Sequence, residues 1–304
     1  MFDVIVIGGS YAGMQAAMML ARGRSSVLVI DAGERRNRFA HASHGLIGRD
    51  GLAPGDIAAQ ARAQLVAYPE VTWIDARVET VGGEIDAFAV KLSDGSTRTG
   101  RRIILATGVV DILPDVPGLA EQWGTGAAAC PYCHGYELER GAIGVLATGP
   151  ASIHHAMMLP QWGATTFFTN GAIELDDAQR LDLSRRGAKI DDTPVTSISG
   201  EPGSPVVNLA GGRAVRLRGL FVATRIRLPG DLATQLGCAL QDGPFGQIIA
   251  ADEMRQTSVP GVFACGDAAR FAASVAFSIG DGAMAGSAAH RSLIFAPQAT
   301  AKAA

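Results

Sequence analysis

The chain has 304 residues, 26 of them basic and 29 acidic, and its formal net charge is −3. This balance gives no general attraction for nucleic acid, and no basic run marks a membrane-binding surface. Apolar residues make up 48% of the chain and charged residues 18%, which excludes a disordered chain and is typical of packed α/β layers. No apolar run approaches the roughly 20 residues that a membrane-spanning helix needs. The length suggests two domains.

The start of the chain predicts a strand–helix–strand unit. Phe2–Ile7 and Ser26–Asp31 are β-branched apolar runs, and helix-spaced apolar residues run through Ala16–Ala21 between them. The first strand leads into Gly8-Gly9-Ser10-Tyr11-Ala12-Gly13, which has the position of a G-x-G-x-x-G turn with Ser10 replacing the middle glycine. Such a turn holds a pyrophosphate at the helix N-terminus, and Asp31 is placed to bind a ribose. We therefore predict a nucleotide site here, against the alternative of an ordinary α/β turn.

A second unit of the same kind follows about 135 residues later. Its expected strands and helix are Ala142–Ala147, Ile153–Leu159 and Ala164–Thr169, with the turn Thr148-Gly149-Pro150 after the first strand. Residues 71–108 are interpreted as short strands of an antiparallel insertion, with turns at Gly82-Gly83 and Asp94-Gly95. The chain is expected to cross between domains at Asp111–Gly118 and near Gly237–Gly243, and the tail Ala296–Ala304 to be loose.

These elements predict an α/β fold class with two Rossmann-like, doubly wound, three-layer dinucleotide-binding domains, the second inserted into the first. The outer domain comprises residues 1–112 and 241–304, and the inserted domain comprises residues 113–240. Two later segments, Ile103–Gly108 and Val259–Asp267, resemble the A-T-G and G-D segments of two-dinucleotide-domain flavoproteins. That resemblance implies FAD in the outer domain, contacted by Asp31 and Asp267. The alternative for Asp267 is a helix N-cap before Ala268.

The run Cys130-Pro131-Tyr132-Cys133-His134-Gly135-Tyr136-Glu137 predicts redox chemistry. Two cysteines separated by two residues can close and reopen a small disulfide, and a following helix favours their thiolates. His134 is a candidate to carry the thiol protons. The same string matches c-type haem attachment, but no export signal accompanies it. Zinc would need two further ligands, and a structural disulfide is disfavoured in a reducing compartment.

The remaining cysteines, Cys238 and Cys265, stand singly in apolar surroundings and are predicted to be core thiols. The FAD turn, the internal dithiol and the run from Gln256 to Asp267 together resemble low-molecular-weight thioredoxin reductases over essentially the whole chain. The resemblance implies that Cys133 lies next to the flavin and that Cys130 exchanges with the external dithiol or disulfide. It also implies a homodimer and an inserted domain that swivels between two redox-competent arrangements.

Three departures from the reductases argue against NADPH or NADH. Only the middle glycine of the second turn remains, in Ala147-Thr148-Gly149-Pro150-Ala151-Ser152. After its second strand, Phe167-Phe168-Thr169-Asn170-Gly171 stands where the reductases carry arginines for the 2′-phosphate, although Asn170 could bind a ribose hydroxyl. His134 stands where they carry an acid. The chain is similar to the FAD-dependent dithiol oxidases of the gliotoxin, holomycin and romidepsin type in three segments: the string from Cys130 to Glu137, the pair His154-His155 and the loop Ser43-His44-Gly45.

We therefore predict an FAD-dependent thiol–disulfide oxidoreductase that oxidises a small dithiol with oxygen as acceptor. The alternatives are an NAD(P)H-dependent reductase of thioredoxin or a small disulfide, and a non-catalytic redox sensor. The start of the chain lacks the features of a signal peptide, so we expect a cytoplasmic protein. No metal is predicted, and the predicted catalytic residues are Cys130, Cys133 and His134. The predicted cofactor-binding residues are Gly8, Ser10, Tyr11, Ala12, Gly13, Asp31, Ala32, His44, Val78, Ala106, Thr107, Gly108, Gly266 and Asp267.

Overall fold

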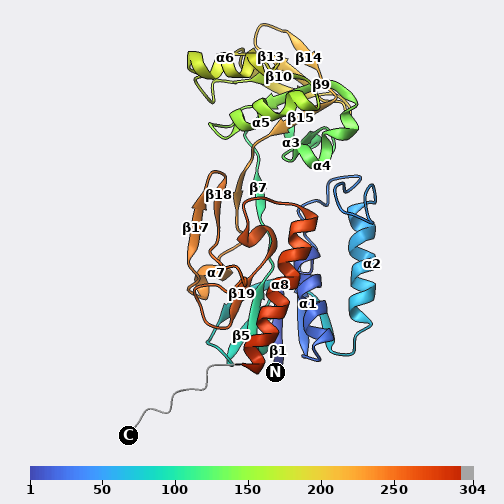
Figure 1. The fold of residues 1–304 in the computed structure, drawn as a ribbon, viewed down its shortest axis with the longest axis vertical. Helices are drawn as coiled ribbons and strands as arrows, with labels where there is room; N and C mark the ends of the chain where they lie inside the picture. Colours follow the sequence, from blue (N-terminus) through green and yellow to red (C-terminus); the bar gives the residue numbers. More distant parts are fainter. Residues whose placement is uncertain (296–304) are drawn as a thin grey trace. The chain divides into compact units, whose positions relative to one another are not determined.

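The computed structural model describes residues 1–295, and the predicted loose tail Ala296–Ala304 lies outside the described residues. The chain forms two compact units (Figure 1). Unit 1 comprises Met1–Arg36, Gly55–Val110 and the chain from Arg227 onward, and unit 2 comprises Asn37–Pro54 and Asp111–Ile226. The strands β7 (Val110–Ile112) and β16 (Arg225–Arg227) stand where the chain leaves unit 1 and returns to it. The assignment of FAD and nucleotide functions to these units stays a prediction.

Unit 1 is built on a sheet of order β3-β2-β1-β6-β5-β4, with β19 also paired to β6. The parallel strands are β1 (Phe2–Ile7), β2 (Val27–Asp31), β3 (Val71–Asp75), the second half of β6 (Thr97–Leu105) and β19 (Val262–Ala264). The antiparallel strands are β4 (Val78–Gly82) and β5 (Phe88–Leu92). The prediction that residues 71–108 are wholly antiparallel is wrong at β3, which extends the parallel sheet because its apolar run pairs with β2.

Both faces of this sheet are buried. Val4 and Val6 of β1 face one apolar cluster, while Ile5 and Ile7 face another, as the two-residue period of a strand requires. The helices α1 (Tyr11–Arg22), α2 (Pro54–Val66) and α8 (Val275–Ile294) belong to this unit. So do the short elements α7 (Leu232–Gln235), β17 (Leu240–Gly243), β18 (Gly246–Ile249) and the 3-10 turn η3 (Gly266–Ala269). The doubly wound arrangement predicted for the first half of the chain is confirmed.

Two glycines bring α8 directly onto α1, and the two helices run side by side in Figure 1. A Cβ atom on Gly282 would lie 2.2 Å from the carbonyl oxygen of Ala12, and one on Gly286 would lie 2.4 Å from that of Ala16. Backbone therefore packs on backbone, with no flexible side chain between the helices that could move aside. This packing fixes the helix that begins at the predicted phosphate-binding turn.

Gly286→Ala is therefore expected to lower the free energy of unfolding by about 1–3 kcal/mol, because the added methyl group overpacks the contact. The matched control is Gly280→Ala on the same helix, where a Cβ atom meets open space. Alanine favours a helix over glycine, so this control is expected to raise stability by up to about 1 kcal/mol. Urea unfolding of both variants measures the difference, and equal effects of the same sign would contradict the packing argument.

Unit 2 is built on an all-parallel sheet of order β11-β10-β9-β15-β8. These strands are β8 (Ala127–Ala128), β9 (Arg140–Leu146), β10 (Gly163–Phe168), β11 (Lys189–Asp191) and β15 (Gly219–Val222). Its helices are α3 (Leu119–Gln122), α4 (Pro131–His134), α5 (Ser152–Met158) and α6 (Asp177–Arg185), with 3-10 turns η1 (Tyr136–Leu138) and η2 (Leu159–Gln161).

An antiparallel sheet of β12 (Val195–Ser199), β13 (Val206–Leu209) and β14 (Ala214–Arg216) completes the unit. Apolar clusters cover both sides of the parallel sheet, as buried parallel strands require. The second predicted strand–helix–strand unit is confirmed as β9, α5 and β10. Unit 2 is thus a second doubly wound layer structure with its own core.

Candidate functional site

The glycine turn of unit 1 is held tightly against the next strand. Gly8 has φ +107°, which favours glycine, and a Cβ atom there would lie 2.3 Å from the carbonyl oxygen of Ala106. A Cβ atom on Gly13 would lie 1.8 Å from the carbonyl oxygen of Gly8, so helix and strand meet without a side chain between them. Ser10 is the N-cap residue of α1 and makes no side-chain cap. The first turn of α1 therefore has the form of a phosphate-binding helix N-terminus.

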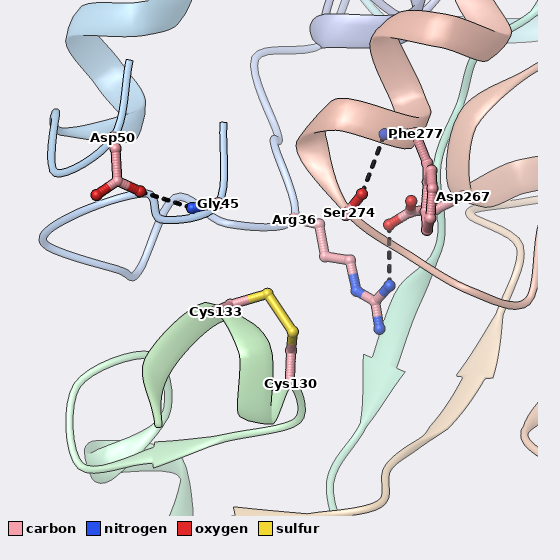
Figure 2. The surroundings of a disulfide bond; sticks show 8 residues. All are labelled: Arg36, Gly45, Asp50, Cys130, Cys133, Asp267, Ser274 and Phe277. Atoms are coloured by element: carbon pink, nitrogen blue, oxygen red, sulfur yellow. Dashed lines mark hydrogen bonds and ion pairs between the residues drawn. A yellow bond between two sulfur atoms is a disulfide. The ribbon is translucent and has the colours of Figure 1, made fainter. Parts of the chain in front are cut away.

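Both predicted cofactor acids lie in unit 1 and are half-buried. The carboxylate of Asp31 accepts the backbone N–H of Gly9 at 3.1 Å and so joins the end of β2 to the glycine turn. Asp267 receives a guanidinium N–H of Arg36 at 2.9 Å (Figure 2) and the hydroxyl of Ser278 at 3.4 Å. The N-cap alternative for Asp267 is wrong: Cys265 is the N-cap residue of η3, and Asp267 lies within that turn.

The other predicted cofactor-binding residues of unit 1 surround the same strand ends. Tyr11, Ala12 and Gly13 form the first turn of α1, and Ala106, Thr107 and Gly108 follow β6. Ala32 is exposed directly after β2, Val78 opens β4, and Gly266 opens η3 with φ +68°. A Cβ atom on Gly108 would meet open space, in contrast to Gly8. The uncapped helix, the acids and this open turn fit an adenine dinucleotide at the carboxyl edge of the sheet.

In unit 2, Cys130 and Cys133 form a disulfide at the start of α4, with their Cα atoms 5.3 Å apart (Figure 2). Cys130 is the N-cap residue of α4, and Pro131 provides a first helical position that needs no backbone donor. The backbone N–H of Cys133 donates to the carbonyl oxygen of Cys130 at 3.2 Å. Both cysteines thus sit on one short turn, and the bond can open and close within it.

Aromatic side chains flank the dithiol turn. Tyr132, between the two cysteines, is 74% exposed and meets the ring of Trp162 edge to face, with centroids 5.4 Å apart. A Cβ atom on Gly135 would lie 2.6 Å from the Trp162 ring, so this indole packs against the backbone of the turn. Tyr136 is 86% exposed. The dithiol therefore lies beside accessible aromatic surface.

His134 is the last residue of α4, and its environment favours the neutral imidazole. Burial lowers the pKa of His134 below its ordinary value, the charge of Glu137 opposes this change, and that of His44 adds to it. His44 lies in unit 2 with the dithiol, where its Nδ1 is 3.4 Å from a carboxylate oxygen of Glu137. A contact of His44 with the flavin, predicted from the sequence, stays a prediction.

The second glycine turn is closed by its own side chains. The hydroxyl of Ser152, a fully buried residue, accepts the backbone N–H of Thr148 at 3.0 Å, and the Thr148 hydroxyl donates to the carbonyl oxygen of Ala223 at 2.6 Å. The backbone N–H groups of Ser152 and Ile153 bond to the carbonyl oxygens of Gly149 and Pro150. Three backbone N–H groups of this segment, those of Thr148, Ser152 and Ile153, are thus bonded within it.

The edge where the adenosine ribose of a nicotinamide nucleotide would bind has internal partners as well. The side-chain oxygen of Asn170 accepts the backbone N–H of Val195 at 2.7 Å, so this amide has a structural partner. Arg180 donates to Asp192 at 2.9 Å, and Arg213 pairs with Asp191 at 2.7 Å. Arg180 and Arg213 are therefore both engaged with aspartates, which does not favour a 2′-phosphate at this edge.

Cys238 and Cys265 are buried as predicted, and burial raises the pKa of Cys265 to about 12. The ring centroids of His154 and His155 are 6.5 Å apart and the rings are tilted to each other, and burial lowers the pKa of His155 to about 4.

Across residues 1–295, no group of three or more His, Cys, Asp or Glu side chains is arranged to hold a metal ion. No helix in that range is long and apolar enough to cross a membrane.

Sequence reasoning missed three contributors. The first is Arg36, which was not assigned as the partner of Asp267. The second is the buried carboxylate of Asp281, whose Oδ1 lies 2.8 Å from a guanidinium nitrogen of Arg255 and 2.7 Å from one of Arg270. Glu137 was noted only as part of the dithiol string. These contacts join distant segments, and the one local signal was the density of Arg and His between residues 35 and 49.

Comparison with known proteins agrees with this geometry. Residues 2–301 match the model of the pyridine nucleotide-disulphide oxidoreductase family. The chain belongs to this family. It is 33% identical to the thioredoxin reductase tcpT of Claviceps purpurea over 96% of this chain and 94% of that protein.

Two solved structures are similar over nearly the whole chain. An oxidoreductase from Agrobacterium tumefaciens is 52% identical with TM-score 0.94, covering 97% of this chain and 99% of that one. The protein HlmI is 38% identical with TM-score 0.89, covering 96% and 92%. The family member described here is thus an FAD-dependent disulfide oxidoreductase with Cys130 and Cys133 as its redox pair.

Proposed function

We propose that this oxidoreductase oxidises a small dithiol to a disulfide and that oxygen is the final electron acceptor. The closed second turn, in which Ser152 takes the backbone N–H of Thr148, carries this proposal. An enzyme driven by NADPH needs that turn for a pyrophosphate and cations for a 2′-phosphate. A dithiol oxidase needs neither, so an internally bonded turn does not impair it.

The exchange step uses the disulfide of unit 2. A thiolate of the substrate attacks Sγ of Cys130, the Cys130–Cys133 bond breaks, and Cys133 leaves as a thiolate. The second substrate thiolate then attacks the substrate sulfur of the mixed disulfide, which releases Cys130 and closes the substrate disulfide. The substrate loses two electrons and two protons, and the electrons now reside in the enzyme dithiol. FAD held in unit 1 at the turn of Gly8 and by Asp31 and Asp267 would supply a two-electron acceptor, so that the Cys130–Cys133 disulfide re-forms and oxygen takes up the two electrons and two protons as hydrogen peroxide.

His134 is proposed as the acid–base group of the exchange. It directly follows Cys133, and its lowered pKa keeps the imidazole neutral, and therefore able to accept a thiol proton, around neutral pH. The exposed rings of Tyr132 and Tyr136 offer contact area to a compact substrate with an apolar body. These features support a small dithiol as the substrate.

Anaerobic titration of the flavin tests the proposal. Small dithiols such as dithiothreitol are expected to bleach the flavin absorbance rapidly, whereas NADPH and NADH at micromolar concentration are expected to leave it unchanged. In air, hydrogen peroxide should form in equal amount to the dithiol consumed. Rapid bleaching of the flavin by NADPH or NADH would overturn the proposal that the enzyme oxidises a dithiol with oxygen as the acceptor.

The similarity to thioredoxin reductases such as tcpT favours a second candidate, a reductase of thioredoxin-like proteins driven by a nicotinamide nucleotide. Bleaching by NADPH followed by transfer to a thioredoxin would establish it. A single stoichiometric reduction by dithiols, with no further turnover in air, would instead indicate a redox sensor. Multiple turnovers with any dithiol exclude the sensor.

A further inference from the structure

The short helix that carries the redox pair needs support from the rest of unit 2. α4 has four residues, and the backbone N–H of Gly135 closes its single turn by donating to the carbonyl oxygen of Pro131 at 2.7 Å. Forming one helical turn fixes several dihedral angles for one hydrogen bond, so a helix this short is unstable without tertiary contacts. When the disulfide is open, such contacts must keep the thiols of Cys130 and Cys133 close together.

Trp162 supplies a contact of this kind from a neighbouring segment. It directly follows η2, and its backbone N–H donates to the carbonyl oxygen of Leu159 at 2.9 Å. Its side chain packs against the apolar cluster of unit 2 that contains the fully buried Leu159. The indole therefore has a fixed position against which the dithiol turn can pack.

The indole meets a face of the dithiol turn that does not carry the sulfurs. Tyr132 and Gly135 are three residues apart and so lie on one face, while Cys130 and Cys133 lie on another. The ring of Tyr132 is edge to face with that of Trp162, although most of its surface is exposed to water. Trp162 thus supports the turn and leaves the disulfide free for exchange.

Gly135 shows how closely the indole approaches the turn. Its φ of −76° and ψ of −34° suit any residue, so its backbone conformation does not require glycine. A Cβ atom there would lie 2.6 Å from Cδ1 of Trp162 and 2.6 Å from the carbonyl oxygen of Pro131. The indole and the first helical residue together exclude a side chain, and the glycine lets the Trp162 ring reach the backbone of the turn.

We propose that Trp162 is a positioning residue for the redox pair, which keeps the dithiol turn ordered while the disulfide is open and so favours its closure. With the indole in place, reduction leaves Cys130 and Cys133 close together, and re-forming their bond orders little of the chain. Without it, reduction would release the turn, and closure would have to order the turn again. The inference concerns the pair itself and does not depend on the proposed substrate or acceptor.

Anaerobic equilibration of the holoenzyme with dithiothreitol and its cyclic disulfide tests the inference. Dithiothreitol gives two electrons and two protons to the Cys130–Cys133 disulfide and closes to its own disulfide. Acid quenching, alkylation and mass spectrometry of the peptide with both cysteines measure the reduced fraction. We expect Trp162→Leu to lower the ratio of reduced to oxidised dithiothreitol at the midpoint about tenfold, which is a rise in reduction potential of about 30 mV. Trp162→Phe keeps an aromatic ring and should shift this ratio by less than about threefold.

Trp123→Leu is the matched control. Trp123 is also a half-buried tryptophan of unit 2, but it packs against the other apolar cluster, so its loss should leave the midpoint unchanged. Tyr132→Ser removes only the exposed ring, with little change in helix propensity, and should lower the midpoint ratio about threefold. Tyr132→Phe keeps the ring and should match the wild type.

An unchanged midpoint in Trp162→Leu, or an equal shift in Trp123→Leu, would overturn the inference. If Trp162→Leu does not fold, an unchanged midpoint in Tyr132→Ser would overturn it instead. A wild-type disulfide that dithiothreitol reduces without bleaching the flavin would count against the proposed function and leave the role of Trp162 intact.

Discussion

Cys133→Ser and Cys130→Ser are each expected to lower dithiol oxidation by at least about 10⁴-fold, because the two sulfurs act as one unit and neither can form the disulfide alone. In the proposed mechanism, Cys130→Ser leaves a thiolate at Cys133 and should add a long-wavelength absorbance to the flavin spectrum. Cys133→Ser should remove electron transfer to FAD. Stopped-flow spectroscopy with dithiothreitol measures both effects.

The two buried cysteines supply the control. The pKa of Cys265, about 12, and the raised pKa of Cys238 keep both thiols protonated at neutral pH. Cys238→Ala should therefore retain turnover, and a thiol reagent should label two cysteines in the reduced native enzyme and none in the oxidised one. Retained turnover in either Cys130→Ser or Cys133→Ser would contradict the redox role of this pair.

Asp281→Asn is expected to lower the free energy of unfolding by about 3 kcal/mol, since it leaves two arginines facing a neutral amide in a buried site. Asp281, on α8, is 4% exposed and receives two guanidinium N–H groups from Arg270 and one from Arg255. This expected loss of unfolding free energy is at the lower end of the range for broken buried ion pairs, because the Arg270 side chain remains 30% exposed to water. Urea unfolding of the holoenzyme measures the change.

Asp182→Asn is the matched control for this ion cluster. Asp182 pairs with Arg186 one turn away on the surface of unit 2, with both side chains about half exposed. Its loss should change the free energy of unfolding by no more than about 0.5 kcal/mol. Similar unfolding curves for Asp281→Asn and Asp182→Asn would show that the buried cluster does not stabilise unit 1.

The sequence predicted the parts of the fold that local patterns determine. The strands Phe2–Ile7 and Val27–Asp31 follow from short β-branched runs, and the turn at Gly8 follows from its glycines, because the backbone there can adopt few conformations. The parallel pairing of β3 was missed, since an apolar run does not reveal the direction of its partner strand.

The candidate site was predictable only where its residues are neighbours in the chain. Cys130, Cys133 and His134 stand together in one string, so their chemistry was evident. The contact between His44 and Glu137, and that between Arg36 and Asp267, join segments far apart along the chain. Side-chain packing in the folded state decides such contacts, and composition does not encode them. The homodimer implied by the family resemblance stays a prediction.

The hydroxyl of Ser152 has a consequence for redesign. Adding arginines after β10 would supply cations for a 2′-phosphate, yet the N–H of Thr148 would still point at that serine. A nucleotide would have to break this partly buried hydrogen bond to gain an equivalent one, for little net affinity. A redesign toward a nicotinamide electron donor would therefore have to replace Ser152 before it adds arginines after β10.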